Sequence, residues 1–257
     1  MSTTPESLAK LKPLDPESAK KVKDAAKTAT PPPESVAEEA AAGIHPGVER
    51  WPVKTGTDAD FAKVGVNKLD GADLGPGIVD TTVEEMIALP RAANMPPVHS
   101  AFTKNNFYQD RRFAPTETTV WRLKVVITEA KLEQDGDYHL VLKSPTSAKT
   151  MIGEIPDPDP AFVKNPVWLA DIKTARNAMD KKLGHSLMPK DFAPEEMAPP
   201  TEERFAAAPM PDETAAMTKV GGTATVIGVG FFDSSHGQTG VAPTAIELHP
   251  IFSIVFD

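Results

Sequence analysis

The alternation of apolar and polar residues after about Thr118 is the feature that most constrains the fold of this chain. Successive side chains of a strand point to opposite faces, so a period of two predicts strands with one buried face. The run TTVWRLKVVITEAKLE starts the pattern, DYHLVLKS continues it after an Asp-Gly turn, and a third short run covers residues 150–155. Because Asp-Gly between two such runs is a strong hairpin signal, the three runs predict an antiparallel meander.

One helix and two further strands complete the pattern. The segment NPVWLADIKTARNAMDKKLG repeats apolar residues at helical spacing and reaches a glycine stop at Gly184. After a proline-rich acidic excursion at 186–219, GGTATVIGVGFFD and AIELHPIFSIVFD return to strand patterns, the first with glycines where a barrel must bend. This order is that of an OB-type barrel, whose closure removes exposed sheet edges. We therefore predict a mainly β fold over 118–257, an OB-type five-stranded barrel with one helix between strands three and four; an α+β sandwich of the same order is the alternative.

Two regions precede the predicted barrel. Residues 1–42 contain few large apolar groups, so there is little surface to offset the entropy of ordering them, and we expect a disordered tail. Residues 43–117 contain aromatic rings among turn residues and one short helix pattern, TTVEEMIALP, with a threonine cap and a proline just beyond its end. We expect this segment to be an irregular, extended arm that packs its rings on the barrel.

Composition excludes several classes of protein and site. The chain has no cysteine, which excludes disulfides, thiolate metal sites and cysteine nucleophiles. Its net charge of −9 argues against a generic nucleic-acid binder, although a local basic groove stays open. No run approaches the roughly 18 apolar residues of a membrane span. The N-terminal stretch also lacks the apolar segment of an export signal, so we expect a cytoplasmic protein with no membrane partner.

Two polar loops form the predicted ligand site. In an OB-type barrel the loop between strands one and two lies beside the loop between strands four and five. These loops are 133–137 and 233–240, and both combine polar residues with glycine. Plain hairpin turns that use such residues for their backbone conformation are the alternative interpretation. The candidate ligand-binding residues are Asp135, Asp137, His139, Asp233, His236 and Gln238.

Histidines close to carboxylates suggest a metal site as a second interpretation. Asp137 and His139 are two residues apart, as are Glu247 and His249, so each pair projects from one face of a strand. Imidazole with carboxylate is the ligand set of zinc, manganese and iron sites. The competing view is that each histidine pairs with a local carboxylate or carbonyl, and strand five is not expected to pair with strand two. The candidate metal ligands are His139, His236, His249 and Glu247, and a divalent metal is the only cofactor that the pattern leaves open.

No motif assigns catalytic residues, because neither a nucleophile with a positioned base nor a GxGxxG before a helix is present. One stretch mixes cations with aromatic rings, as proteins that bind single-stranded nucleic acid do. An arm that packs these rings on the barrel is the alternative. The members are Lys104, Phe107, Tyr108, Arg111, Arg112, Phe113, Arg122 and Lys124.

Four motifs, ERWPVKTGTDAD, DGDYHLVL, TMIGEIPDP and GVGFFDSSHGQTGVAPTAIELHP, resemble those of a family of uncharacterised bacterial proteins, many of them exported. The resemblance covers residues 45–257, with Thr244 where an Asn is common and Phe162-Val163 where relatives often have cysteine-containing segments. It implies a shared fold and carries no activity. Our first expectation is a non-catalytic binding module for an unidentified ligand or protein partner. The alternatives, in order of preference, are a metal-dependent hydrolase or nuclease and a single-stranded nucleic-acid binder.

Overall fold

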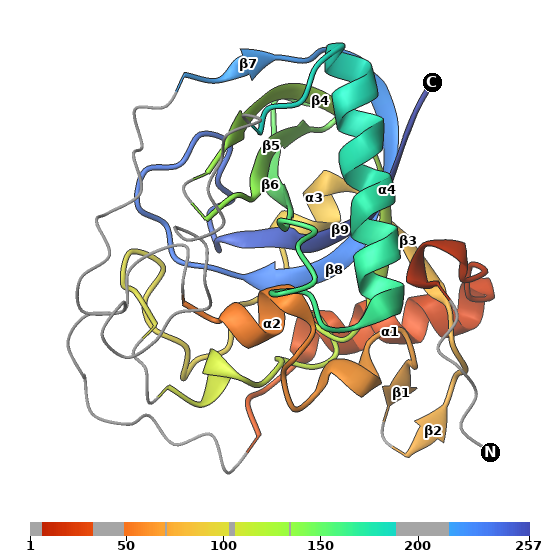
Figure 1. Cartoon of the computed structure of the whole chain (residues 1–257). Helices are drawn as coiled ribbons and strands as arrows, with labels where there is room; N and C mark the ends of the chain where they lie inside the picture. Colours follow the sequence, from red (N-terminus) through yellow and green to blue (C-terminus); the bar gives the residue numbers. More distant parts are fainter. Residues whose placement is uncertain (1–6, 33–48, 70, 103–105, 134, 189–215) are drawn as a thin grey trace.

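A closed barrel of five strands forms the centre of the molecule (Figure 1). Around the barrel the strands follow the order β4, β5, β6, β9 and β8, and β8 closes the ring by pairing antiparallel with β4. Neighbouring strands are antiparallel except for β6 and β9, which are parallel. The barrel strands are β4 (Val120–Leu132), β5 (Tyr138–Lys143), β6 (Thr150–Ile155), β8 (Thr223–Phe232) and β9 (Ile246–Phe256). The computed structural model describes residues 7–32, 49–69, 71–102, 106–133, 135–188 and 216–257.

The helix between the third and fourth barrel strands is α4 (Pro166–Leu183). It begins where the Asn165 side chain accepts hydrogen bonds from two backbone N–H groups, and it ends at Gly184, which adopts φ +78°. Its buried side chains, among them Trp168 and Met179, face β9 and β6. The predicted mainly β fold, with a closed five-stranded barrel and, in the described part of the chain, one helix between strands three and four, is confirmed.

The predicted inner face of the first barrel strand is also confirmed, since Trp121, Leu123, Val125 and Ile127 are all buried. The glycines of β8 lie where this strand becomes irregular: its pairing with β9 shifts register between Ile227 and Gly230. A Cβ on Gly230 would lie 2.5 Å from the carbonyl oxygen of Thr116. Only glycine therefore lets β8 approach the chain that leads into the barrel.

The arm before the barrel is ordered in its described residues and extends the sheet. Strand β3 (Ile78–Thr81) pairs parallel with the start of β4. The predicted short helix is α3 (Val83–Ile87), and the Thr82 and Glu85 side chains form a reciprocal capping box at its start. The remaining elements of the arm and of the return to the barrel are α2 (Trp51–Thr55), η2 (Phe61–Lys63), β1 (Lys68–Leu69), β2 (Ala72–Asp73), η3 (Phe107–Gln109) and β7 (Thr218–Lys219).

The expectation of a disordered tail is wrong for residues 7–32, which contain η1 (Leu8–Lys10) and α1 (Pro16–Thr28). Asp15 caps α1, and the helix buries Val22 and Ala26, one turn apart. The chain just before α1 exchanges backbone hydrogen bonds with Ile78 in β3. The surface that orders this segment belongs to a distant part of the chain, so its own composition does not reveal it. Residues 1–6 and 33–42, and most of the acidic excursion (189–215), lie outside the described residues.

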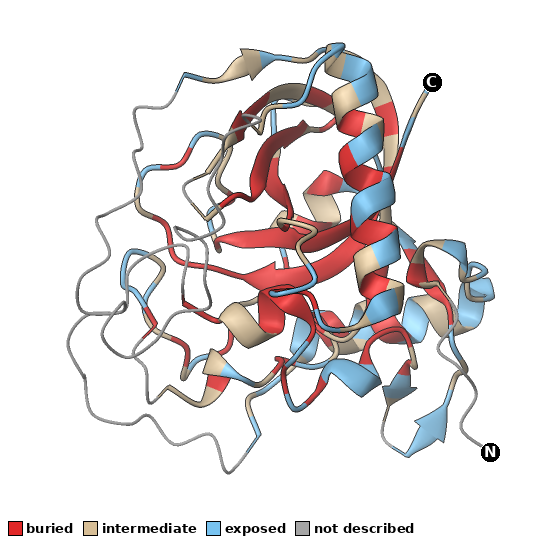
Figure 2. Cartoon of the chain, in the orientation of Figure 1, coloured by how far each residue is buried: buried red, intermediate tan, exposed pale blue. Residues whose placement is uncertain are grey.

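Both faces of several barrel strands are buried (Figure 2). In β5 every residue from Tyr138 to Leu142 is buried, including those that alternate with the apolar face. Polar side chains on the second face, such as His139, are therefore enclosed between the barrel and the segments that cover it. No helix in the described part of the chain is long and apolar enough to cross a bilayer.

Candidate metal centre

Polar side chains from three adjacent strands meet on this enclosed second face. His139 in β5 is paired in register with Glu154 in β6, so their side chains lie on the same side of the sheet. On the other side of β6, Ile152 pairs with Glu247 in β9, which brings His249, two residues further along, close to Glu154. The four polar residues are all buried. Glu154 therefore lies between two histidines that come from different neighbouring strands.

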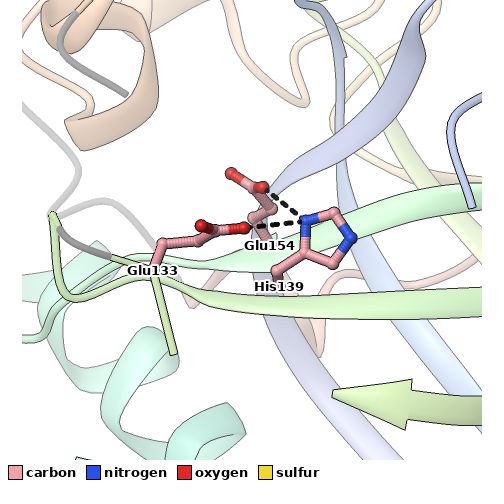
Figure 3. Close-up of side chains that lie close together, drawn as sticks. All are labelled: Glu133, His139 and Glu154. Carbon is pink, nitrogen blue, oxygen red and sulfur yellow. Dashed lines mark hydrogen bonds and ion pairs between the residues drawn. The ribbon is translucent and has the colours of Figure 1, made fainter. Parts of the chain in front are cut away.

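The first group of converging side chains is Glu133, His139 and Glu154 (Figure 3). His139 Nδ1 lies 3.2 Å from Glu154 Oε1 and 3.3 Å from Glu133 Oε1. Its other nitrogen, Nε2, lies 2.9 Å from the carbonyl oxygen of Thr239. Because a carbonyl oxygen only accepts, Nε2 must carry the hydrogen of this bond. Nδ1 is thus directed at two carboxylates, and positive charge, as a proton or a metal ion, must lie between these three atoms.

The two distances from His139 Nδ1 are those between ligands of one metal ion. Two ligands that are each about 2.1 Å from an ion lie about 3.0 Å apart at a right angle and about 3.4 Å apart at the tetrahedral angle. Both distances from His139 Nδ1 fall between these limits. Two edges of the group therefore match a coordination sphere, and all three of its ligand atoms lie within 4.8 Å of one another.

A second group surrounds His249 and uses the other oxygen of Glu154. His249 Nδ1 lies 2.9 Å from Glu154 Oε2 and 3.3 Å from Glu247 Oε1. His249 Nε2 lies 3.3 Å from Asp137 Oδ2, but this approach does not have the geometry of a hydrogen bond. Possible ligand atoms of Asp137, Glu154 and His249 all lie within 4.8 Å of one another. The two groups share Glu154 and together form a single cluster.

Burial and neighbouring charge set the protonation of this cluster. Burial raises the pKa of Glu133, and it raises the pKa of Glu247 to about 8, with the charge of Glu154 acting in the same direction on both. Burial also opposes ionisation of Glu154, but its close contacts with His139 and His249 outweigh burial and hold the pKa of Glu154 well below its usual range. For both histidines burial opposes the charged form, yet the facing carboxylates raise the pKa of each. The cluster therefore retains positive charge between its carboxylates.

A buried lysine borders the cluster. Lys54, from α2, is 2% exposed, and its Nζ lies 4.0 Å from Asp233 Oδ2. Burial opposes its charge, but Asp233 first, and then Glu154, Asp135 and Asp137, outweigh it and raise the pKa of Lys54. Burial, together with the charge of Asp137, raises the pKa of Asp135 well above its usual range. Lys54 therefore supplies one fixed positive charge on the side of the cluster where the two predicted loops meet.

The structure brings together several of the residues predicted from sequence. Asp137, His139, Glu247 and His249, the two histidine–carboxylate pairs, all belong to the cluster. The pairs meet although β5 and β9 are not paired, because Glu154 in the strand between them contacts both histidines. The sequence did not lead us to predict Glu154 as a ligand, and it placed Glu133 only in the loop of residues 133–137. The available signal for Glu154 was a lone carboxylate in an otherwise apolar strand, in the strand that an OB-type order places beside strand five.

The loop of residues 233–240 approaches the cluster through its backbone. Its Thr239 carbonyl contacts His139, so the two predicted loops are adjacent. Asp233 is buried and accepts a hydrogen bond from its neighbouring backbone N–H, while the half-buried His236 donates its backbone N–H to the Gln238 side chain. His236 is in neither group of converging ligands among the described residues. This loop therefore orients His139 through its backbone, and its histidine side chain lies elsewhere.

Where they are described, the rings proposed for nucleic-acid binding are not exposed, and each of the cations faces a carboxylate. Tyr108 and Phe113 are buried in the core, and Arg112 forms a fully buried ion pair with Asp58. The Arg122 guanidinium pairs with Asp80, Lys124 contacts Asp257, Arg111 faces Asp60 and Phe107 packs edge-on against Tyr108. Lys104 lies outside the described residues. The alternative interpretation, an arm that packs its rings on the barrel, accounts for this stretch.

Comparison with known proteins gave no matching protein-family model, no matching curated protein and no matching solved structure. The functional argument therefore rests on the geometry of the cluster.

Proposed function

We propose that this protein is an OB-type binding module whose ligand is a divalent metal ion held by Glu133, His139 and Glu154. The observation that supports this most directly is the double approach to His139 Nδ1, with Glu154 at 3.2 Å and Glu133 at 3.3 Å, while Nε2 is committed to the Thr239 carbonyl. Metal-binding histidines regularly donate their other ring N–H to a carbonyl or carboxylate, which fixes the tautomer and directs the free nitrogen at the ion. His139 is oriented in this way.

A proton on Nδ1 is the competing occupant of the same space. An N–H group points in one direction within the ring plane and serves one acceptor well. The contact with Glu154 has hydrogen-bond geometry, whereas Glu133 is close to the same nitrogen only as an ion pair. A metal ion would bind all three atoms at once, so the second carboxylate at ligand spacing favours the metal.

The donor atoms select the class of ion. Imidazole nitrogen with carboxylate oxygen, in a chain without cysteine, suits Zn²⁺, Mn²⁺ or Fe²⁺. Calcium and magnesium favour all-oxygen sites, so they fit less well. The module is therefore proposed to bind a transition-metal ion or zinc.

Metal-dependent hydrolysis is the second candidate function. Three protein ligands leave a coordination position for water, as in catalytic zinc sites. Glu133 is also the most accessible of the three, with 15% of its side chain exposed against 10% for Glu154 and none for His139. Cleavage of a chromogenic phosphodiester that requires added Mn²⁺ and is lost in Glu133→Gln would support this candidate. Equal rates with and without metal would rule it out.

Titration calorimetry with Zn²⁺ and Mn²⁺, on chelator-treated protein without a histidine tag, tests the proposal. Even the loss of an outer partner of a metal ligand weakens affinity about 10–100-fold, so His139→Gln and Glu133→Gln should each lose at least that much. His185→Gln is the matched control, because His185 is exposed just beyond α4, and it should bind as the wild type does. His236→Gln should also bind normally, which separates this cluster from the neighbouring loop. Unchanged affinity in a folded His139→Gln variant, or no binding by the folded wild type, would contradict the proposal.

A further inference from the structure

We infer that a second divalent ion binds beside the first, with the Glu154 carboxylate bridging the two. This inference rests on the proposed function, because the second position shares a ligand with the first. It assigns to the protein a two-ion centre whose ligands come from β5, β6, β9 and the loop after β4.

The position of Glu154 makes it a suitable bridge. Its strand, β6, runs between β5 and β9, and its two carboxylate oxygens turn to opposite neighbours. Oε1 lies 3.2 Å from His139 Nδ1, and Oε2 lies 2.9 Å from His249 Nδ1. Neither oxygen is shared between the histidines at these distances. The carboxylate therefore presents one oxygen to each position.

The surroundings of His249 repeat those of His139. In each group one imidazole Nδ1 meets an oxygen of Glu154 and one further carboxylate, Glu133 in the first group and Glu247 in the second, each at 3.3 Å. In the second group the contact with Glu247 has hydrogen-bond geometry, while Glu154 approaches Nδ1 at 2.9 Å outside that direction. A single proton again serves only one of these two carboxylates. The ligand atoms that converge here are those of Asp137, Glu154 and His249, so Glu247 has to move toward an ion on Nδ1 to become its second carboxylate ligand.

The second ring nitrogen of His249, Nε2, lies close to a hydrogen-bond acceptor, Asp137 Oδ2. Nε2 is fully buried and makes no hydrogen bond, although Asp137 Oδ2 lies 3.3 Å away. The other oxygen of Asp137 accepts the backbone N–H of Asp157 at 3.0 Å, which holds Oδ2 toward the ring. If an ion binds Nδ1, the ring proton lies on Nε2. A small rotation of the ring then lets Nε2–H donate a hydrogen bond to Asp137 Oδ2. Asp137 thus corresponds to the Thr239 carbonyl of the first group.

The charge of the cluster accommodates two ions. The cluster contains four carboxylates, Glu133, Asp137, Glu154 and Glu247, around two imidazoles. Two dications neutralise these four carboxylates with both histidines neutral, which is the form in which imidazole binds metals. With a single dication, part of this charge is balanced by protons on Glu247 and His249, whose pKa values the site raises, and a second ion replaces those protons.

The stoichiometry of Mn²⁺ in the full chain tests the inference. Chelator-treated protein is loaded with Mn²⁺ and desalted, and its metal content is measured by mass spectrometry with plasma ionisation. We expect two ions per wild-type chain and two in the exposed control His185→Gln. Glu247→Gln should retain one ion and bind the other at least tenfold more weakly, and the retained ion shows that this variant is folded.

Each result leads to a different conclusion. Two ions in the wild type and one in Glu247→Gln support the bridged pair. One ion in the wild type, lost in His139→Gln, overturns the second position and leaves the proposed function standing, whereas no ion overturns both. Should Glu247→Gln not fold, the paramagnetic resonance spectrum of the wild type decides. Ions about 3.5–4 Å apart, as in two-metal sites, give an exchange-coupled signal, and the spectrum of isolated Mn²⁺ alone would contradict the inference.

Discussion

Glu117→Gln should destabilise the fold strongly, because Glu117 joins the arm to the end of the barrel through a fully buried ion pair. Arg50 Nη1 and Nη2 donate to its two oxygens at 2.6 and 2.8 Å, and neither side chain is exposed. The backbone N–H groups of Phe113 and Phe232 also donate to these oxygens, each at 2.7 Å. Both oxygens of Glu117 therefore accept two hydrogen bonds each.

The expected magnitude follows from these contacts. Glutamine preserves the shape but removes the charge opposite a buried guanidinium, and it turns one acceptor into a donor that faces other donors. Removing one partner of a buried ion pair costs about 3–5 kcal/mol. At about 2–4 °C per kcal/mol for a chain of this size, the melting temperature should fall by about 6–20 °C.

Thermal and urea unfolding, followed by circular dichroism and tryptophan fluorescence, measure this effect. Asp80→Asn is the matched control, because it breaks the exposed pair with Arg122 and should cost less than about 1 kcal/mol. If Glu117→Gln were no more destabilising than Asp80→Asn, the arm would not be fixed to the barrel through Arg50 and Glu117 as described.

Three further predictions concern the packing of the arm and the N-terminal helix. Gly230→Ala should cost about 1–3 kcal/mol, since the new Cβ would meet the Thr116 carbonyl oxygen at 2.5 Å, and urea unfolding would detect this. Trypsin should leave α1 uncut in the native protein and cut it in Val22→Asp, which undocks the helix; rapid cleavage of α1 in the wild type would show that it is not docked. Burial, with the charge of Asp233, raises the pKa of Glu49 to about 8, so its protonated form is favoured on folding, and stability should fall as pH rises from about 4.5 to about 8. Glu49→Gln should flatten this part of the stability curve, and an unchanged curve would contradict the assignment.

The barrel was predictable because its signals are local. Alternation along β4 and β5, the Asp-Gly turn between them and the glycines of β8 each lie within one short stretch of sequence. That the chain around α1 is ordered could not be predicted from such local signals. Val22 and Ala26 provide little apolar surface, and what they pack against is formed near β3, far along the chain.

The candidate site was predictable in part for the same reason. Asp137 with His139 and Glu247 with His249 are local pairs, and the structure places all four in the cluster. The contribution of Glu154 depends on the register of β6 against both β5 and β9. That register is a long-range property. The lone glutamate marks a polar position in an otherwise apolar strand, but it does not show which residues of β5 and β9 it meets. The backbone contact from Thr239 to His139 is likewise invisible in the sequence, because any residue can supply a carbonyl.

Anomalous diffraction from crystals soaked in Zn²⁺ or Mn²⁺ tests the central claim most directly, because it locates the ion itself. The account predicts a strong peak between His139 Nδ1, Glu133 Oε1 and Glu154 Oε1, about 2.1 Å from each, with His139 Nε2 still donating to the Thr239 carbonyl. A peak that appears only beside His236, or no peak while His139 Nδ1 keeps its direct hydrogen bond to Glu154 in saturating metal, would contradict it.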